Sequence, residues 1–191
     1  MRLESQIEKL SEIGLTLNPG IDLDHFFISF DRSEYEKKPF ELILFVYGTE
    51  VEEQPWGRFF CDKAWNLDYE CINEDGDYVN IVRNLHRLTG GIRKIENLSD
   101  RVDPENNFAS LTYSIDGVEK NHRIKINDDW ADPETISSIM RDLKSEDANF
   151  YAMDNGQAAV WFYLDQKSAH DLNVLAGNIF NLNKKPWWKI W

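Results

Sequence analysis

No run of about 18 consecutive apolar residues, the length at which a helix can cross a bilayer, occurs in the sequence. The uninterrupted apolar core of a secretion signal is also missing, because Glu4, Glu8 and Glu12 lie near the start of the chain. No internal repeat or low-complexity tract is present. We therefore expect a soluble, cytoplasmic globular protein with no membrane span.

The sequence lacks the common motifs of metal and cofactor sites. It has no Cys-x-x-Cys pair, no His-Glu-x-x-His and no two histidines at helical spacing, so we expect no metal site. A glycine loop for phosphate, a Gly-x-Ser-x-Gly turn and a dinucleotide fingerprint are absent as well. We therefore expect no cofactor. These absences favour a non-catalytic protein and leave an enzyme as the alternative.

Cysteine is scarce, with only Cys61 and Cys71 in the chain. Because no signal directs the chain to an oxidising compartment, two buried free thiols are the favoured prediction, and a disulfide or a reactive thiol is the alternative. A Cys-His nucleophile would need a histidine nearby in space. The four histidines lie in unrelated sequence contexts, at His25, His86, His122 and His170.

Positive charge is in short supply, since 21 Lys and Arg face 34 Asp and Glu and the formal net charge is -13. A negative net charge is unfavourable for binding a partner through its phosphates, which are also negative. We therefore expect neither nucleic acid nor an anionic membrane as partner. Disorder is excluded by the composition, because 42% of the residues are hydrophobic and 13% are aromatic. The chain can therefore bury a substantial core.

The length of 191 residues predicts a single domain over residues 1–183, followed by a Trp- and Lys-rich tail at 184–191. The tail contains three of the seven tryptophans. We expect it to dock on the acidic surface of its own chain, and a partner-binding or membrane-interface anchor is the alternative. A homodimer built on this tail, or on the hairpin at 149–164, is a further possibility.

Apolar spacing predicts mainly helices at the start of the chain. An amphipathic helix is formed by residues three or four apart, namely Leu3, Ile7, Leu10, Gly14 and Leu17. Residues 21–30 are predicted as a further helix, with a strand as the alternative, because a short apolar run does not reveal its period. Pro39 fits the first position of a buried helix, or of a central strand, that ends at Gly48.

Strands and a helix follow in the middle of the chain. Residues 59–72 are predicted as strands in which every second residue from Trp65 to Cys71 faces inward. A regular apolar stripe then predicts a helix over residues 78–88. Residues 97–107 form the longest segment without periodicity.

Two turn signals dominate the second half. Asp116-Gly117 and Asn155-Gly156 are preferred pairs for two-residue hairpin turns, which pair Ile115 with Val118 and Asp154 with Gln157. Helices are predicted from Asp132-Pro133 and from Ser168. The sequence therefore predicts an α+β fold, in which an antiparallel β-sheet with hairpins at 108–126 and 149–164 packs against several helices.

Two acidic clusters are candidate sites. Residues 73–77 have the composition of a calcium loop without its spacing, so a turn followed by a helix cap is the better interpretation. Asp128 and Asp129 lie beside Trp130 and have no evident structural duty, whereas Asp132 can cap a helix.

Several short segments carry a family resemblance, namely 17–21 (LNPGI), 34–36 (EYE), 39–40 (PF), 65–72 (WNLDYECI), 76–78 (GDY), 98–100 (LSD), 102–103 (VD) and 127–132 (NDDWAD). Over residues 20 to 160 the chain resembles a family of uncharacterised acidic bacterial cytoplasmic proteins, some of which are similar to immunity proteins of bacterial toxin systems. The resemblance implies no catalytic motif and does not extend to the tail.

Together these features favour a non-catalytic acidic binding protein, in the concrete form of an immunity-type inhibitor that neutralises a basic bacterial toxin by direct contact. Its partner would be a basic protein. The residues expected to bind the partner are Glu50, Glu52, Glu53, Asp128, Asp129 and Trp130. The alternative is a small enzyme or ligand-binding domain with a site near Asp128, Asp129 and Trp130, to which His122 would contribute.

Overall fold

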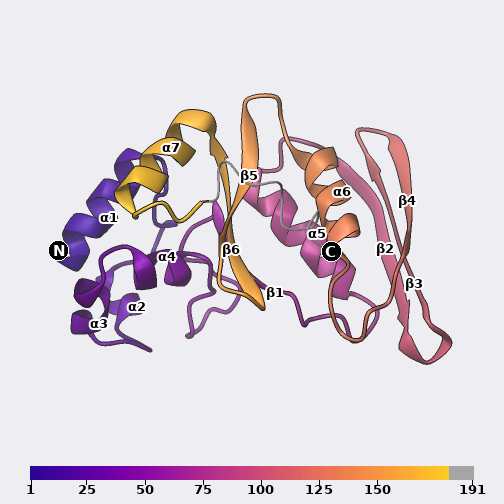
Figure 1. Cartoon of the computed structure of the whole chain (residues 1–191), viewed down its shortest axis with the longest axis horizontal. Coiled ribbons are helices and arrows are strands. Elements are labelled where there is room, and N and C mark those ends of the chain that lie inside the picture. The colour runs from indigo at the N-terminus through magenta and orange to yellow at the C-terminus, as the bar shows by residue number, and fades with distance from the viewer. Residues whose placement is uncertain (181–191) are drawn as a thin grey trace. The chain divides into compact units, whose positions relative to one another are not determined.

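The computed structural model describes residues 1–180, which fold into two compact units (Figure 1). Unit 1 comprises Met1–Leu67, Asp147–Asn155 and residues 159–180, and unit 2 comprises Asp68–Glu146 and Gly156–Ala158. The α+β class is confirmed, because helices accompany two three-stranded antiparallel sheets. The single domain over residues 1–183 stays a prediction, and the tail at 184–191 lies outside the described residues.

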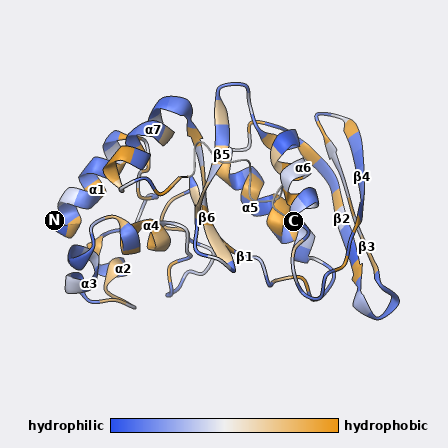
Figure 2. Ribbon diagram, in the orientation of Figure 1, coloured by the Kyte–Doolittle hydropathy of each residue, from blue (hydrophilic) through white to orange (hydrophobic). Residues whose placement is uncertain are grey.

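Unit 1 packs helices against a sheet of strand order β1-β6-β5. Its strands are β1 (Ala64–Asp68), β5 (Ala148–Asp154) and β6 (Ala158–Asp165), and its helices are α1 (Leu3–Glu12), α2 (Leu23–Phe26), α3 (Arg32–Lys37), α4 (Glu41–Tyr47) and α7 (Gln166–Leu175). Figure 2 shows α4 and β6 largely in the hydrophobic colour. Their buried side chains, including Ile43, Leu44 and Phe162, form one core with Leu3 and Leu10 of α1.

Unit 2 contains a sheet of strand order β2-β3-β4. Its elements are α5 (Asp77–Leu88), β2 (Ile95–Asp103), the short 3-10 helix η1 (Pro104–Asn106), β3 (Phe108–Ile115), β4 (Val118–Ile124) and α6 (Pro133–Leu143). The buried residues of β3 alternate with half-buried ones, as in a strand that covers a core on one face. Both long helices bury an apolar stripe, which includes Leu85 of α5 and Ile139 of α6.

The first predicted hairpin is confirmed in its register, with Ile115 opposite Val118. The second hairpin differs, because Asp154 pairs with Ala159, so four residues (155–158) separate the paired positions instead of the predicted two. A two-residue turn of this kind needs positive φ at both positions, and only Gly156 has it. The register shift of two residues leaves every side chain on its predicted face, since side chains alternate with a period of two.

Several predicted boundaries are wrong. The amphipathic helix ends at Glu12, the helix expected over residues 21–30 shrinks to α2, and only Ala64–Asp68 of residues 59–72 forms a named strand. The buried helix begins at Glu41 rather than at Pro39, after Phe40 adopts a positive φ of 71°. Val118, which pairs with the buried Ile115, lies at the tip of its hairpin and is 59% exposed.

The segment 97–107, which shows no periodicity, contains most of β2. This strand lies at the edge of its sheet, and its register shifts between Glu96 and Ser99, where Asn97 has a positive φ of 54°. An irregularity of this kind breaks the alternation of side chains along a strand. For this reason the sequence of β2 shows no period-two pattern, although the segment forms a strand.

Within residues 1–180, no helix is both long enough and apolar enough to cross a membrane.

Candidate functional site

The six residues predicted to bind a partner divide between the two units. Glu50, Glu52 and Glu53 lie in unit 1, in the loop that follows α4, and all three are exposed. Asp128, Asp129 and Trp130 lie in unit 2, between β4 and α6. The role of all six residues in binding stays a prediction.

The segment around Asp128 has structural duties that the sequence did not reveal. Asp128 adopts a positive φ of 55°, a conformation that Asp tolerates better than most residues. The carbonyl oxygen of Asp129 accepts a hydrogen bond from the Ile72 backbone N–H at 2.8 Å, and Trp130 forms a bridge with Glu70. The acidic residues thus belong to a loop whose backbone pairs with residues 69–72.

The turn predicted within residues 73–77 is confirmed, but the predicted helix cap is wrong, because the N-cap residue of α5 is Gly76 and no side chain of this position caps the helix. The Asp77 carboxylate accepts hydrogen bonds from the backbone N–H groups of Asn73 at 2.6 Å and Glu74 at 2.9 Å, at the start of α5. Among the residues described, no group of three or more His, Cys, Asp and Glu side chains is placed to hold a metal ion.

Both cysteines are free, as predicted, with Cys61 buried and Cys71 half-buried. Burial raises the pKa of the Cys71 thiol to about 12, and the neighbouring carboxylates of Asp77, Asp68 and Asp129 raise it in the same direction. The thiolate is the nucleophilic form of cysteine. Cys71 therefore remains a protonated thiol at neutral pH and is a poor candidate for a catalytic nucleophile.

His122 belongs to a polar cluster that links the sheet of unit 2 to α6. Its Nε2 atom lies 3.2 Å from the Tyr113 hydroxyl, and the two rings stack with centroids 5.5 Å apart. The Tyr113 hydroxyl donates to the Asp142 carboxylate at 2.9 Å, and the same carboxylate pairs with Lys120 at 2.9 Å. His122 thus contacts Tyr113, whose hydroxyl contacts Asp142. The enzyme alternative had expected Asp128 and Asp129 beside His122 instead.

The His122 cluster makes stability depend on pH. Burial lowers the pKa of His122 below its ordinary value of 6.5, an effect that the Asp142 charge opposes and the Lys120 charge reinforces. Below pH 6.5 the unfolded chain therefore binds a proton at His122 that the folded chain takes up only at lower pH, so the free energy of unfolding falls as pH drops through this window.

We expect the urea midpoint to fall less steeply in His122→Gln than in the wild type when unfolding is measured from about pH 7.5 to about pH 5.5, above the range where most carboxylates titrate. The same replacement at the exposed His170 is measured alongside as the matched control. Equal slopes in the wild type and His122→Gln would contradict the assignment.

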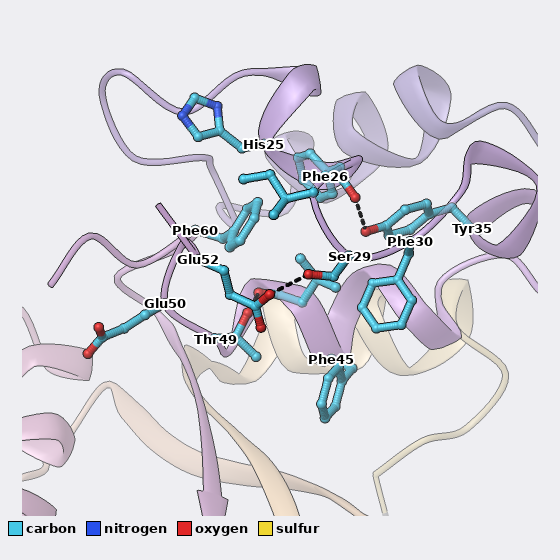
Figure 3. Close-up of a pocket in the computed structure, with 12 residues that line it drawn as sticks. His25, Phe26, Ser29, Phe30, Tyr35, Phe45, Thr49, Glu50, Glu52 and Phe60 are labelled. Carbon is cyan, nitrogen blue, oxygen red and sulfur yellow. Dashed lines mark hydrogen bonds between the residues drawn. The ribbon is translucent and has the colours of Figure 1, made fainter. Parts of the chain in front are cut away.

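Unit 1 contains a cavity of about 160 Å³. Its walls come from α2, from the loop before α3, from α3 itself, from α4 and from the loop after α4 (Figure 3). We call it the aromatic pocket, because the rings of five residues line it, namely Phe26, Phe30, Tyr35, Phe45 and Phe60. Two predicted binding residues, Glu50 and Glu52, also line it, together with His25, Ser29 and Thr49.

The aromatic floor of the pocket is held in place by ring packing and one buried hydrogen bond. Phe26 packs against Phe60 with ring centroids 4.9 Å apart and against the edge of Tyr35 at 5.7 Å. The Tyr35 hydroxyl donates to the carbonyl oxygen of Phe26 at 2.7 Å, as Figure 3 shows. Because Phe26 and Tyr35 are each only 1% exposed, the floor is a preformed part of the core.

The carboxylates around the pocket differ in their partners. Glu53 lies 3.4 Å from Arg58 and 3.3 Å from His25. The Ser29 hydroxyl donates to the Glu52 carboxylate, and Figure 3 shows this carboxylate turned toward the pocket while that of Glu50 lies at its outer edge. Among residues 1–180, neither Glu50 nor Glu52 forms an ion pair. Two negative charges at the pocket thus lack a cation within the described chain.

A second depression in unit 1, of about 450 Å³, is lined by Glu4, Ile7, Leu17, Asp22, Leu23 and Asp24. Two of its acids already have partners, because Glu4 pairs with Arg32 at 2.7 Å and Asp22 contacts His25 at 2.7 Å. The aromatic pocket is therefore the better candidate for a site that accepts positive charge.

The sequence indicated the acids of the pocket but not its aromatic wall. Phe26 and Phe45 lie in segments whose apolar character predicted core helices, and Phe60 was assigned to a strand region. No spacing rule in the sequence connects these three positions. Their convergence depends on the packing of α2 against α4 and the loop that follows it.

Comparison of the chain with protein-family models, with curated proteins and with solved structures finds no match. The resemblance to a family of acidic bacterial proteins therefore stays a prediction.

Proposed function

We propose that this chain is a non-catalytic acidic binding protein whose partner is a basic protein. The observation that carries the proposal is the pair of carboxylates, Glu50 and Glu52, that lack a cation within the described residues at the edge of an apolar pocket. An apolar pocket beside complementary charge is the usual form of an interface hot spot.

Charge and cavity size both support a protein partner over a small-molecule substrate. The net charge of -13 would steer a basic protein toward this surface. Pockets for drug-sized ligands have volumes of about 300 to 1,000 Å³. The aromatic pocket, at about 160 Å³, has the size for one side chain rather than for a whole cofactor or substrate.

The narrower form of the proposal is immunity-type inhibition, in which the basic partner is a bacterial toxin. Its support is the net charge together with the sequence resemblance. Inhibition would follow from steric occlusion, because a bound protein covers the active site of a basic enzyme. The measurement is the activity of the captured partner with and without this protein. Unchanged activity under saturating binding would overturn the narrower form while leaving the binding proposal in place.

Binding is tested by capturing proteins from the native lysate on tagged wild type and on two charge variants with the same net charge. Glu50→Lys/Glu52→Lys reverses the pocket acids, and Glu8→Lys/Glu12→Lys reverses two exposed acids of α1. We expect one basic protein, identified by mass spectrometry and confirmed with purified material, on the wild type and on the α1 variant only. Its capture should weaken at high salt, because screening reduces charge attraction.

Equal capture by the pocket variant and the wild type would place the partner elsewhere and contradict the proposal. Capture of a neutral or acidic protein, or of no protein at all, would also contradict it. Equal losses in both variants would show that net charge, rather than the pocket, determines binding.

A further inference from the structure

We propose that the aromatic pocket binds the side chain of one arginine, supplied by the partner. This inference rests on the proposed function, since the basic partner provides the arginine. It specifies the chemistry of the anchor residue, which the wider proposal leaves open.

The pocket matches the apolar part of an arginine. Its volume of about 160 Å³ is close to that of an apolar cavity of about 150 Å³ that holds benzene. The lining includes aromatic rings of the buried core, such as Phe26 and Phe60, together with Val46. The three methylene groups of an arginine can lie against such a wall while the charged end stays at the mouth.

The mouth of the pocket matches the charged end. The Glu52 carboxylate accepts one hydrogen bond from Ser29, and an ionised carboxylate has acceptor sites for several more. A planar guanidinium with five donors can reach Glu52 and still stack on an aromatic ring. Glu50 adds a second negative charge at the outer edge.

Other single side chains fit less well. A leucine or phenylalanine would cover the mouth and leave Glu52 partly desolvated without a cation, which is unfavourable for a carboxylate. A lysine supplies charge, but its ammonium is more strongly hydrated and cannot stack as a plane. Arg58, which contacts the pocket residue His25, does not fill the role, because it is bound to Glu53 and to the backbone carbonyl oxygens of Pro55 and Gln54.

The test uses four capped amino acids as probes with the full chain, namely the N-acetyl methylamides of arginine, citrulline, lysine and norleucine. Citrulline has nearly the shape of arginine without its charge. Binding is followed by two-dimensional NMR of backbone amides at constant ionic strength. We expect arginine to bind about tenfold tighter than citrulline, because its hydrogen bonds to Glu52 are assisted by charge. The shifted amides should include those of Ser29, Val46 and Thr49, which line the pocket.

Two variants and a matched control locate the binding. Ile28 lines the pocket and is 43% exposed, so Ile28→Lys places a cation of the chain itself at the mouth and should abolish arginine binding. Val174→Lys makes the same change on α7, where Val174 is 66% exposed and does not line the pocket, and should leave arginine binding unchanged. Glu52→Gln keeps the side-chain shape and should reduce the arginine affinity to that of citrulline.

Arginine binding no tighter than that of citrulline or norleucine would overturn the inference, and so would equal binding of lysine. Shifts confined to residues outside the pocket would overturn it as well. The two proposals fail separately. If Glu50→Lys/Glu52→Lys abolishes capture of a basic protein but no probe enters the pocket, the arginine anchor is wrong and the proposed function stands. If the probes bind as expected but no basic protein is captured, the proposed function is wrong.

Discussion

Replacing Gly48 with alanine is expected to lower the free energy of unfolding by about 3 kcal/mol, at the upper end of the usual cost of overpacking a core. A Cβ atom at this position would lie 2.7 Å from the Asn66 backbone nitrogen and 2.9 Å from a Val160 methyl group. The same Asn66 N–H donates to the Gly48 carbonyl oxygen at 2.8 Å. Relief of the clash would therefore require β1 to move away from the end of α4.

The cost at Gly48 is steric rather than conformational. Its φ of -84° suits any residue, whereas Gly20 has a φ of 82° and open space around its missing side chain. Gly20→Ala is therefore the matched control, in which only the backbone is strained, at about 1 kcal/mol. Urea unfolding of both variants separates the two effects. A Gly48→Ala variant as stable as Gly20→Ala would show that the α4–β1 contact adjusts without difficulty.

Gly48 also shows how far the sequence alone could be interpreted. Its position after an apolar run predicted the end of a buried element, and α4 does end there. The sequence did not reveal that β1 passes against that end, because a close approach between two backbones leaves no local pattern. Helix stripes and caps do leave a local pattern in the sequence, and they were predicted correctly. An example is Asp132, whose side chain accepts a hydrogen bond from the Thr135 N–H at 2.8 Å.

The second hairpin shows where a strong local signal gave way to contacts made elsewhere in the chain. Asn155-Gly156 favours a two-residue turn, but the Gln157 carbonyl oxygen accepts a hydrogen bond from the Tyr69 N–H at 2.9 Å. This pairing to a segment distant in sequence holds Gln157 away from the position opposite Asp154. Turn propensity is a preference of order 1 kcal/mol, and one long-range hydrogen bond can balance it.

The candidate site shows the same contrast between local signals, which the sequence reveals, and tertiary contacts, which it does not. The exposed acids Glu50 and Glu52 were predicted to bind a partner, because charge is visible in the sequence. The pocket beside them could not be predicted, since its rings converge only through tertiary packing. Its support includes a residue that drew no attention in the sequence, Gln6 of α1, which is completely buried.

Gln6 satisfies three backbone groups from separate parts of unit 1. Its amide nitrogen donates to the carbonyl oxygens of Tyr35 at 2.9 Å and Met1 at 3.1 Å, and its amide oxygen accepts from the Phe40 N–H at 2.8 Å. Phe40 holds a positive φ of 71°, which is costly for a bulky residue and persists only where neighbouring contacts impose it. Gln6 is one of those contacts.

We expect Gln6→Leu to lower the free energy of unfolding by about 3 kcal/mol or more, because it leaves buried backbone groups of Tyr35 and Phe40 without partners. That loss is a large fraction of the total stability of a typical domain, about 5 to 15 kcal/mol. Urea unfolding measures it. Gln166→Leu, at the exposed first position of α7, is the matched control and should change stability by less than about 0.5 kcal/mol.

Hydrogen exchange tests whether the loss is local. The Phe40 amide should be protected in the wild type and exchange rapidly in Gln6→Leu while the β3–β4 amides of unit 2 stay protected. Tyr35 and α4 carry part of the pocket wall, so this variant should also weaken arginine binding although Gln6 does not line the pocket. Unchanged protection at Phe40 would mean that the left-handed turn is held by ring burial alone. In that case Gln6 would contribute to stability without positioning the α3–α4 connection that carries the site.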